Sequence, residues 1–168
     1  MFQNLLLMLS LIIPGVVTAQ NLSDGQILSV LQTVNGLEIE AGQNAEKKAV
    51  NPEVKRFAKQ MAVDHKRSQG AAGKIMKSLN EKAGEIAAIV EIKEMAAESK
   101  KKLNGLSGAE FEKTFVDNQI KMHQTVLQKI RNEMLPSVES GDLKALLAEN
   151  EEKIEAHLRH AETLKKQL

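Results

Sequence analysis

The sequence predicts an all-α fold, a four-helix bundle, from three observations. Aromatic residues make up only 2% of the chain, whereas the strong helix formers Ala, Leu, Lys, Glu and Gln are abundant. Apolar residues recur at spacings of three and four along four long segments. Capping residues stand at the start of each segment. With 168 residues, 42% of them hydrophobic, the chain can bury the core of one domain.

The first 19 residues are expected to be a cleaved signal peptide, and residues 20–168 to form the single domain. An apolar run over residues 5–13 is followed by Pro14 and then by small residues ending at Ala19. The run is short for a membrane span, so a retained anchor is the less favoured alternative. Cleavage would leave no integral membrane span and would place the domain outside the cytoplasm.

The first two long helices are predicted from their caps. A capping box formed by Ser23 and Gln26 opens the first helix. Asn51 caps the second, with Pro52 at its first position. Because glycine weakens a helix interior, glycines inside these two helices indicate that their backbones approach closely. These glycines are Gly36, Gly42, Gly70 and Gly73.

Residues 80–106 are expected to be a long, partly helical crossover between the second and third long helices. Its less regular helix ends at a lysine run, residues 100–102, just before Asn104-Gly105. A segment of this length can return the chain along the bundle. The second and third long helices would then be parallel, as in ferritin-like bundles with one crossover.

The last two long helices complete the bundle. A second capping box, Ser107 with Glu110, is predicted to open the third helix. Asp142 is predicted to cap the fourth, whose apolar stripe runs to Leu168.

Four polar residues interrupt the apolar stripes, one on each helix: Glu38, His65, His123 and His157. They lie 14 to 16 residues after their caps. In helices of roughly 26 residues this is mid-helix, the same level whichever way each helix runs. A shared pattern supports the placement, because a Phe stands eight residues before both His65 and His123. We therefore expect one Glu and three His to meet at the centre of the bundle.

Four buried polar groups need hydrogen bonds, water or a cation. Imidazole and carboxylate are ordinary ligands of zinc, copper, iron and manganese. Asp64 and Glu155 lie beside the stripes and are candidates for orienting the ligands. The alternative is a hydrogen-bonded polar layer, completed by buried water, that only fixes helix register.

Composition and motifs exclude several other functions. A net charge of +1 and the scarcity of aromatic residues argue against nucleic-acid binding. The chain has no Cys, no phosphate-binding loop and no activated nucleophile, so we predict neither catalytic residues nor an organic cofactor. None of the three His is preceded by Glu in a Glu-x-x-His motif, which argues against a di-iron centre. A protein partner or a homodimer stays open.

Several short motifs resemble those of the domain-of-unknown-function 4142 family across residues 22–168. They are Val54-Lys-Arg-Phe57, Met61-Ala-Val-Asp-His65, Leu106-Ser-Gly-Ala-Glu-Phe111, Met122-His123 and His157-Leu158. The resemblance implies a ferritin-like bacterial protein outside the cytoplasm, either periplasmic or secreted, of unestablished activity.

These observations favour an exported metal-binding bundle with a role in metal buffering or stress. The alternative is a non-enzymatic interaction module of the cell envelope. A small metal-dependent enzyme ranks third, because the sequence indicates no substrate pocket.

Overall fold

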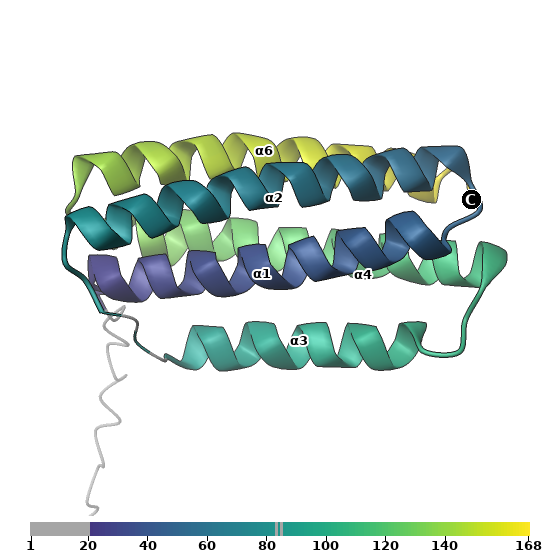
Figure 1. Ribbon diagram of the computed structural model, residues 1–168, viewed down its shortest axis with the longest axis horizontal. Helices are drawn as coiled ribbons and strands as arrows, with labels where there is room; N and C mark the ends of the chain where they lie inside the picture. Colours follow the sequence, from purple (N-terminus) through teal and green to yellow (C-terminus); the bar gives the residue numbers. More distant parts are fainter. Residues whose placement is uncertain (1–20, 83, 85) are drawn as a thin grey trace, which may run out of the picture.

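The computed structural model describes residues 21–82, 84 and 86–168, so the predicted signal peptide lies outside the described part of the chain. Four long helices form an elongated bundle (Figure 1). They are α1 (Asp24–Lys48), α2 (Pro52–Ser78), α4 (Gly108–Lys129) and α6 (Gly141–Lys165). Among the described residues no strand is present, and no helix is long and apolar enough to cross a membrane.

The crossover helix α3 (Ala87–Leu103) connects the second and third long helices. It runs beside α1 and α4 and returns the chain to the end of the bundle where α2 begins (Figure 1). As a result α2 and α4 run in the same direction. This confirms the predicted all-α, ferritin-like bundle with a partly helical crossover.

Two of the predicted helix starts are confirmed. The Ser23 hydroxyl accepts a hydrogen bond from the Gln26 backbone N–H at 3.2 Å, and the Gln26 side chain accepts one from the Ser23 N–H at 2.9 Å. Asn51 Oδ1 accepts from the Glu53 N–H at 2.8 Å, with Pro52 at the first helical position. Local sequence therefore sets the starts of α1 and α2.

The other two starts differ from the prediction. Ser107 precedes α4 but makes no capping hydrogen bond, and the following Gly108 has a left-handed φ of 55°, which distorts the first turn. The last helix begins earlier than expected, because the Ser140 hydroxyl already accepts from the Leu143 N–H at 3.3 Å. Asp142 therefore lies in the first turn of α6 rather than at its cap.

At its far end α4 continues through a π-helical turn, η1 (Ile130–Met134), into the short helix α5 (Leu135–Ser137). Pro136 lies in this last turn. A proline ring clashes with the carbonyl four residues before it in a regular α-helix. The wider π turn offers a physical reason why the helix passes Pro136 before ending.

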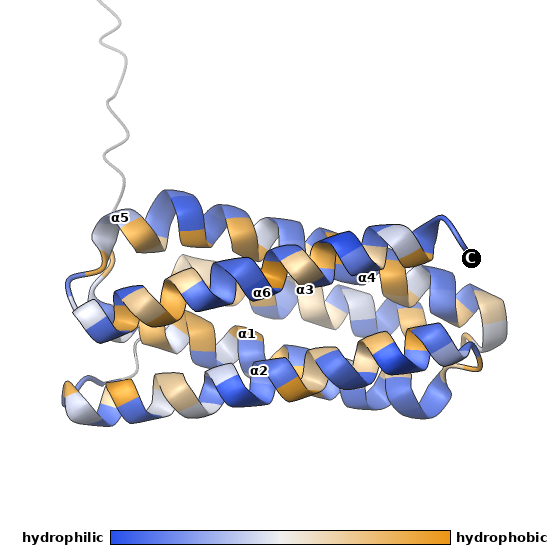
Figure 2. Cartoon of the chain, turned by 90° about the horizontal axis from the view of Figure 1, so that it is seen from above, coloured by the Kyte–Doolittle hydropathy of each residue, from blue (hydrophilic) through white to orange (hydrophobic). Residues whose placement is uncertain are grey.

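The core consists of two apolar clusters with a polar layer between them. Along each long helix one cluster takes most of the apolar residues before the layer and the other most of those after it. On α2, for example, Phe57 and Met61 lie in one cluster and Ala72 in the other. Figure 2 shows the apolar stripes of the helices beside their hydrophilic faces. The layer consists of the mid-helix residues Glu38, His65, Gln119, His123 and His157, all buried.

One glycine shows the predicted close approach of α1 and α2. A Cβ added to Gly42 would lie 2.7 Å from the Ala58 carbonyl oxygen and 3.0 Å from the Ala62 Cβ. Gly36 and Gly73 face only side-chain amides, and Gly70 has nothing within 4 Å. The predicted close approach of the two helix backbones therefore occurs at Gly42 and not at Gly70.

Candidate metal centre

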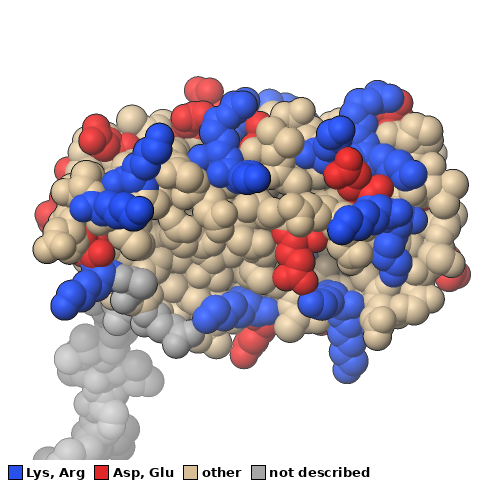
Figure 3. Space-filling view, viewed as in Figure 1, with Lys and Arg blue, Asp and Glu red and all other residues tan. Residues whose placement is uncertain are grey.

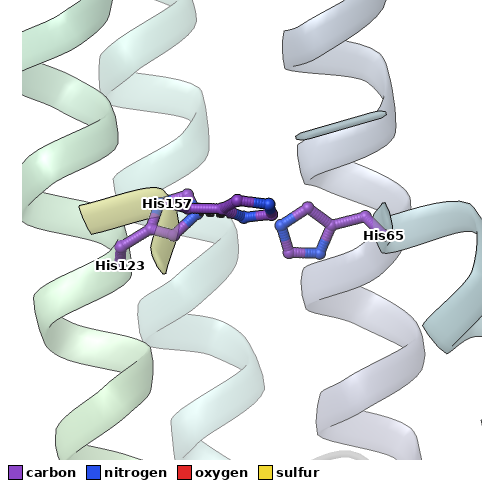
Figure 4. Close-up of side chains that lie close together, drawn as sticks. All are labelled: His65, His123 and His157. Atoms are coloured by element: carbon purple, nitrogen blue, oxygen red, sulfur yellow. Dashed lines mark hydrogen bonds between the residues drawn. The ribbon is translucent and has the colours of Figure 1, made fainter. Parts of the chain in front are cut away.

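The three predicted histidines converge from three different helices. His65 lies on α2, His123 on α4 and His157 on α6, and each is 6% exposed or less. One ring nitrogen from each lies within 4.8 Å of the other two, and the ring centroids are 5.4 to 5.8 Å apart. Figure 4 shows the three rings turned toward one another. The equal spacing from Phe to His on α2 and α4 places Phe57 and Phe115 in edge-to-face contact beside them.

The orientation of His65 is fixed by Asn35 on α1. Its Nδ1 lies 2.8 Å from Asn35 Oδ1, while the Asn35 amide nitrogen donates to the Ser68 hydroxyl at 2.9 Å. Because Oδ1 can only accept, the His65 proton is on Nδ1. His65 Nε2 therefore carries a lone pair, and it is buried without a hydrogen-bond partner. Sequence reasoning missed Asn35, although this polar residue lies one turn before Glu38.

The other two histidines are oriented in the same way. His123 Nδ1 donates to the Gln119 carbonyl, one turn back on α4, at 2.9 Å. His157 Nε2 lies 3.2 Å from Asp64 Oδ2, which also accepts from the Gln60 amide at 3.0 Å. Each ring thus gives one nitrogen to a hydrogen-bond acceptor and leaves the other for the centre of the cluster. Histidines that bind metals in proteins usually donate the N–H of their other ring nitrogen to an acceptor in the same way.

The electrostatics keep all three rings in the form that binds metal. Burial, reinforced by the neighbouring rings, holds the pKa of His65 well below its usual 6.5. Burial and His157 lower the pKa of His123 to about 3. Burial also lowers the pKa of His157, against the opposing effect of Asp64. Neutral imidazoles are expected at neutral pH.

The Asp64 carboxylate lies at the edge of the cluster, with its side chain 9% exposed. Burial acts to raise the pKa of Asp64, but hydrogen bonds from Gln60 and His157 and the charge of Lys153 outweigh it and hold that pKa below 3.8. Asp64 is therefore an anion at neutral pH and can accept a hydrogen bond from the Nε2–H group of His157.

Glu38 is buried beside the cluster without belonging to it. Glu38 lines a narrow gap that His65, His123 and Met122 also line. Burial raises the pKa of Glu38 to about 8, and a hydrogen bond from the Gln119 side chain offsets part of this rise. The second oxygen, Oε2, is buried without a hydrogen-bond partner. Glu38 thus carries a free oxygen next to the histidines.

The predicted orienting residues behave differently from each other. Asp64 contacts His157 directly, whereas Glu155 pairs on the surface with Arg131 and Arg159. His160 is exposed, although its ring lies 5.1 Å from that of Phe57.

A cavity of about 70 Å³ connects the cluster with the surface between α2 and α6. His65 and His157 lie along it, together with Asp64, Glu149 and Lys153. Its volume exceeds that of a single water, so it has room for an ion that has shed most of its hydration shell to approach two of the rings.

The arrangement suits one transition-metal ion. Because the Nε2–H group of neutral His157 donates a hydrogen bond to Asp64, the lone pair of this ring is on Nδ1. That nitrogen lies 3.4 Å from His123 Nε2. Two nitrogens bound to one tetrahedral zinc, each at about 2.0–2.1 Å, are roughly 3.3 Å apart. Three lone pairs facing one another, with an unpaired carboxyl oxygen nearby, fit a cation better than a purely hydrogen-bonded layer.

Comparisons with known proteins agree with the fold and with the motifs. A solved structure described as "CopM in the Cu(II)-bound form" superposes with a TM-score of 0.70 at 15% sequence identity, over 88% of this chain and 99% of that chain. At that identity the likeness concerns the fold alone. No match was found among curated proteins. The family model described as "Domain of unknown function (DUF4142)" matches residues 15–164, and the chain therefore belongs to the DUF4142 family.

Proposed function

We propose that this protein binds one transition-metal ion through His65, His123 and His157, with the Glu38 carboxylate as the fourth ligand. The observation that carries the proposal is the pattern of lone pairs. Each ring has one nitrogen held by Asn35, the Gln119 carbonyl or Asp64. The free nitrogens of His123 and His157 lie 3.4 Å apart, and one nitrogen of each of the three rings lies within 4.8 Å of the other two.

Copper(II) and zinc are the metals that this ligand set favours. Three imidazoles and one carboxylate suit both, and divalent copper binds such sites more tightly than the other first-row metals. A copper-bound relative in fold, CopM, adds support of a general kind. Met122 also lines the gap, and its thioether would help the site to retain copper after reduction to copper(I).

The physiological role that fits such a site is metal buffering or protection from metal stress outside the cytoplasm. The cluster is buried and reached through only a small cavity, which suits holding an ion better than turning over a substrate. Export by the predicted signal peptide, followed by its cleavage, belongs to the same proposal.

Metal content of the mature protein, purified without a histidine tag, tests the proposal. The protein is incubated separately with zinc, copper(II), iron(II) and manganese(II), and unbound metal is removed. We expect close to one zinc or copper per chain, and a copper(II) resonance spectrum with nitrogen coupling from imidazole. Less than about 0.1 ion per chain with every metal would reject the proposal in favour of a polar layer that fixes helix register in an interaction module.

A further inference from the structure

The outer face of α2 is basic from one end to the other. Its seven lysines and arginines are spaced one, three or seven residues apart, which places them within a stripe about 120° wide on the helix surface. All are exposed: Lys55, Arg56, Lys59, Lys66, Arg67, Lys74 and Lys77. The two carboxylates of α2, Glu53 and Asp64, lie outside the stripe. Figure 3 shows Lys and Arg side chains at intervals along α2.

No other described helix has such an excess of positive charge. Lys and Arg outnumber Asp and Glu on α2 by seven to two. The corresponding numbers are two against four on α1, four against three on α3, three against three on α4 and four against six on α6. The whole chain has a net charge of only +1, so its positive charge is concentrated on one side of the bundle.

Few of these cations have a carboxylate partner. Arg56 pairs with Glu53 at 2.7 Å, and Lys59 lies 4.0 Å from Glu46. The other five cations of the stripe pair with no carboxylate among the described residues. The last two lysines of the stripe lie three residues apart, and like charges at that spacing on a helix repel each other. An external layer of negative charge would relieve this repulsion.

The form of the stripe favours a flat anionic surface over other polyanions. It follows one straight helix for about 33 Å, at about 1.5 Å per residue (Figure 1). A layer of lipid phosphates can contact such a stripe along its whole length, whereas the strands of a nucleic-acid duplex wind away from a straight helix. The stripe also has no aromatic side chain on which single-stranded bases could stack.

We propose that the outer face of α2 binds the surface of a membrane that contains anionic lipids, with the helix parallel to that surface. The lipid phosphates pair with the lysines and arginines, and Val63, the one large apolar side chain exposed on α2, contacts the headgroup layer. Each Lys or Arg beside such a surface strengthens binding about fivefold, so a stripe of seven can hold the protein there without a membrane-spanning segment. The proposal requires no metal and does not depend on the histidine cluster.

Vesicle sedimentation with the metal-free mature protein tests the proposal. Vesicles of equal parts phosphatidylglycerol and phosphatidylcholine should bind the protein at about 50 mM salt and release it at about 500 mM. Vesicles of phosphatidylcholine alone should not bind it. Binding to the anionic vesicles should weaken roughly a hundredfold or more in a quadruple variant that lacks unpaired charges of the stripe. Its substitutions are Lys55→Gln, Lys66→Gln, Lys74→Gln and Lys77→Gln.

A matched quadruple variant removes the same charge outside α2. It replaces four exposed lysines that also pair with no carboxylate of the described residues, and its affinity should change less than about fivefold. Its substitutions are Lys101→Gln, Lys113→Gln, Lys144→Gln and Lys166→Gln. Glutamine is a good helix former, so both variants should fold, and circular dichroism checks this.

A tryptophan at the centre of the stripe locates the contact. The chain has no Trp, so Val63→Trp introduces a single fluorophore at a position that is 48% exposed. Its emission should move to shorter wavelength when anionic vesicles are added, because an indole ring favours the headgroup layer. Val90→Trp is the matched control: this position is 43% exposed and lies on α3, which Figure 1 shows beyond α1, so its emission should not change.

No binding to the anionic vesicles at low salt would overturn the proposal, as would equal binding to phosphatidylcholine alone. Equal losses in the two quadruple variants, or an unchanged Val63→Trp spectrum in protein that binds, would show that the stripe is not the contact. Tighter binding to duplex DNA or to polyglutamate than to vesicles, at equal concentrations of negative charge, would overturn it in favour of a soluble polyanion. Metal content has no bearing on any of these outcomes.

Discussion

His123 Nε2 and His157 Nδ1 lie 3.4 Å apart across the contact between α4 and α6, and in the neutral rings both nitrogens carry lone pairs. Two lone pairs at that distance repel unless a proton or a metal ion lies between them. Burial disfavours the proton, because it lowers the pKa of both histidines. The contact therefore has the character of a preformed ligand pair, which a metal ion would stabilise.

Replacing His65 and His123 together by Leu should abolish metal binding without unfolding the protein. Leucine fills similar space and removes two buried polar rings, so we expect the metal-free variant to match the wild type within about 2 kcal/mol or to exceed it. The variant should also lose the rise in melting temperature that metal gives the wild type. Differential scanning calorimetry with and without zinc measures both.

The control for that experiment is His160→Leu. His160 is exposed and outside the cluster, so the variant should keep both the bound metal and the thermal shift. A double variant that retains one metal per chain would show that the ion binds elsewhere.

Asp64 should support metal affinity, and Glu155 should not. Asp64 Oδ2 accepts a hydrogen bond from His157 Nε2 at 3.2 Å, whereas Glu155 pairs with two surface arginines. Asp64→Asn removes the charge that orients and strengthens this ligand, and losses of about 10- to 100-fold are usual for such partners. Competition with a chelator of known affinity should show that loss for Asp64→Asn and no change for Glu155→Gln. Equal effects of the two substitutions would contradict the assigned geometry.

The sequence predicted the four helices because their stripes and caps are local signals, which persist whatever the tertiary structure. Counting residues from each cap placed the polar residues at mid-helix, and His65, His123 and His157 do meet there. Glu38 shares their level, but in the metal-free structure it lies outside the group formed by the three rings, because side-chain direction depends on how each helix rotates about its axis. That rotation is set by packing, which spacing along the sequence does not encode.

Partners from neighbouring helices were harder to find. Gln119 belongs to the polar layer and Asn35 lies one turn before it on α1, but their roles depend on which ring faces them. Asp64 and Glu155 both lie next to a stripe, and only the three-dimensional structure separates the one that contacts a ring from the one that faces solvent.

Stability of the metal-free protein should fall as the pH decreases below about 6.5. The unfolded chain takes up protons on its histidines there, while the folded chain keeps His65, His123 and His157 neutral, because their pKa values are lowered. Each proton taken up only by the unfolded chain contributes about 1.4 kcal/mol per pH unit. Urea denaturation at pH 7, 6 and 5 measures the slope, which should be much shallower in the variant that lacks His65 and His123.

Glu38 should produce the opposite dependence between pH 4.5 and about 8, and so offset part of the histidine effect where the two ranges overlap. Its pKa is about 8 in the folded protein and returns to the ordinary 4.5 on unfolding, so the unfolded chain releases this proton first and stability falls between those values as the pH rises. Glu38→Gln should therefore stabilise the metal-free protein, by a few kcal/mol near pH 8 and by little at pH 4.5. Glu40→Gln, on the exposed face of α1, is the matched control. A Glu38→Gln difference that does not grow with pH would show that the carboxyl is ionised in the folded state.

The packing of α1 on α2 should depend on Gly42 but not on Gly70. Alanine at position 42 would place its Cβ 2.7 Å from the Ala58 carbonyl oxygen, and because that atom is backbone the helices would have to separate. We expect a loss of about 1–3 kcal/mol in the free energy of unfolding. Gly70→Ala meets nothing within 4 Å, so the higher helix propensity of alanine should stabilise the protein by about 0.5–1 kcal/mol. Opposite signs for the same substitution in urea denaturation would confirm that the close approach is local to Gly42, and equal signs would contradict it.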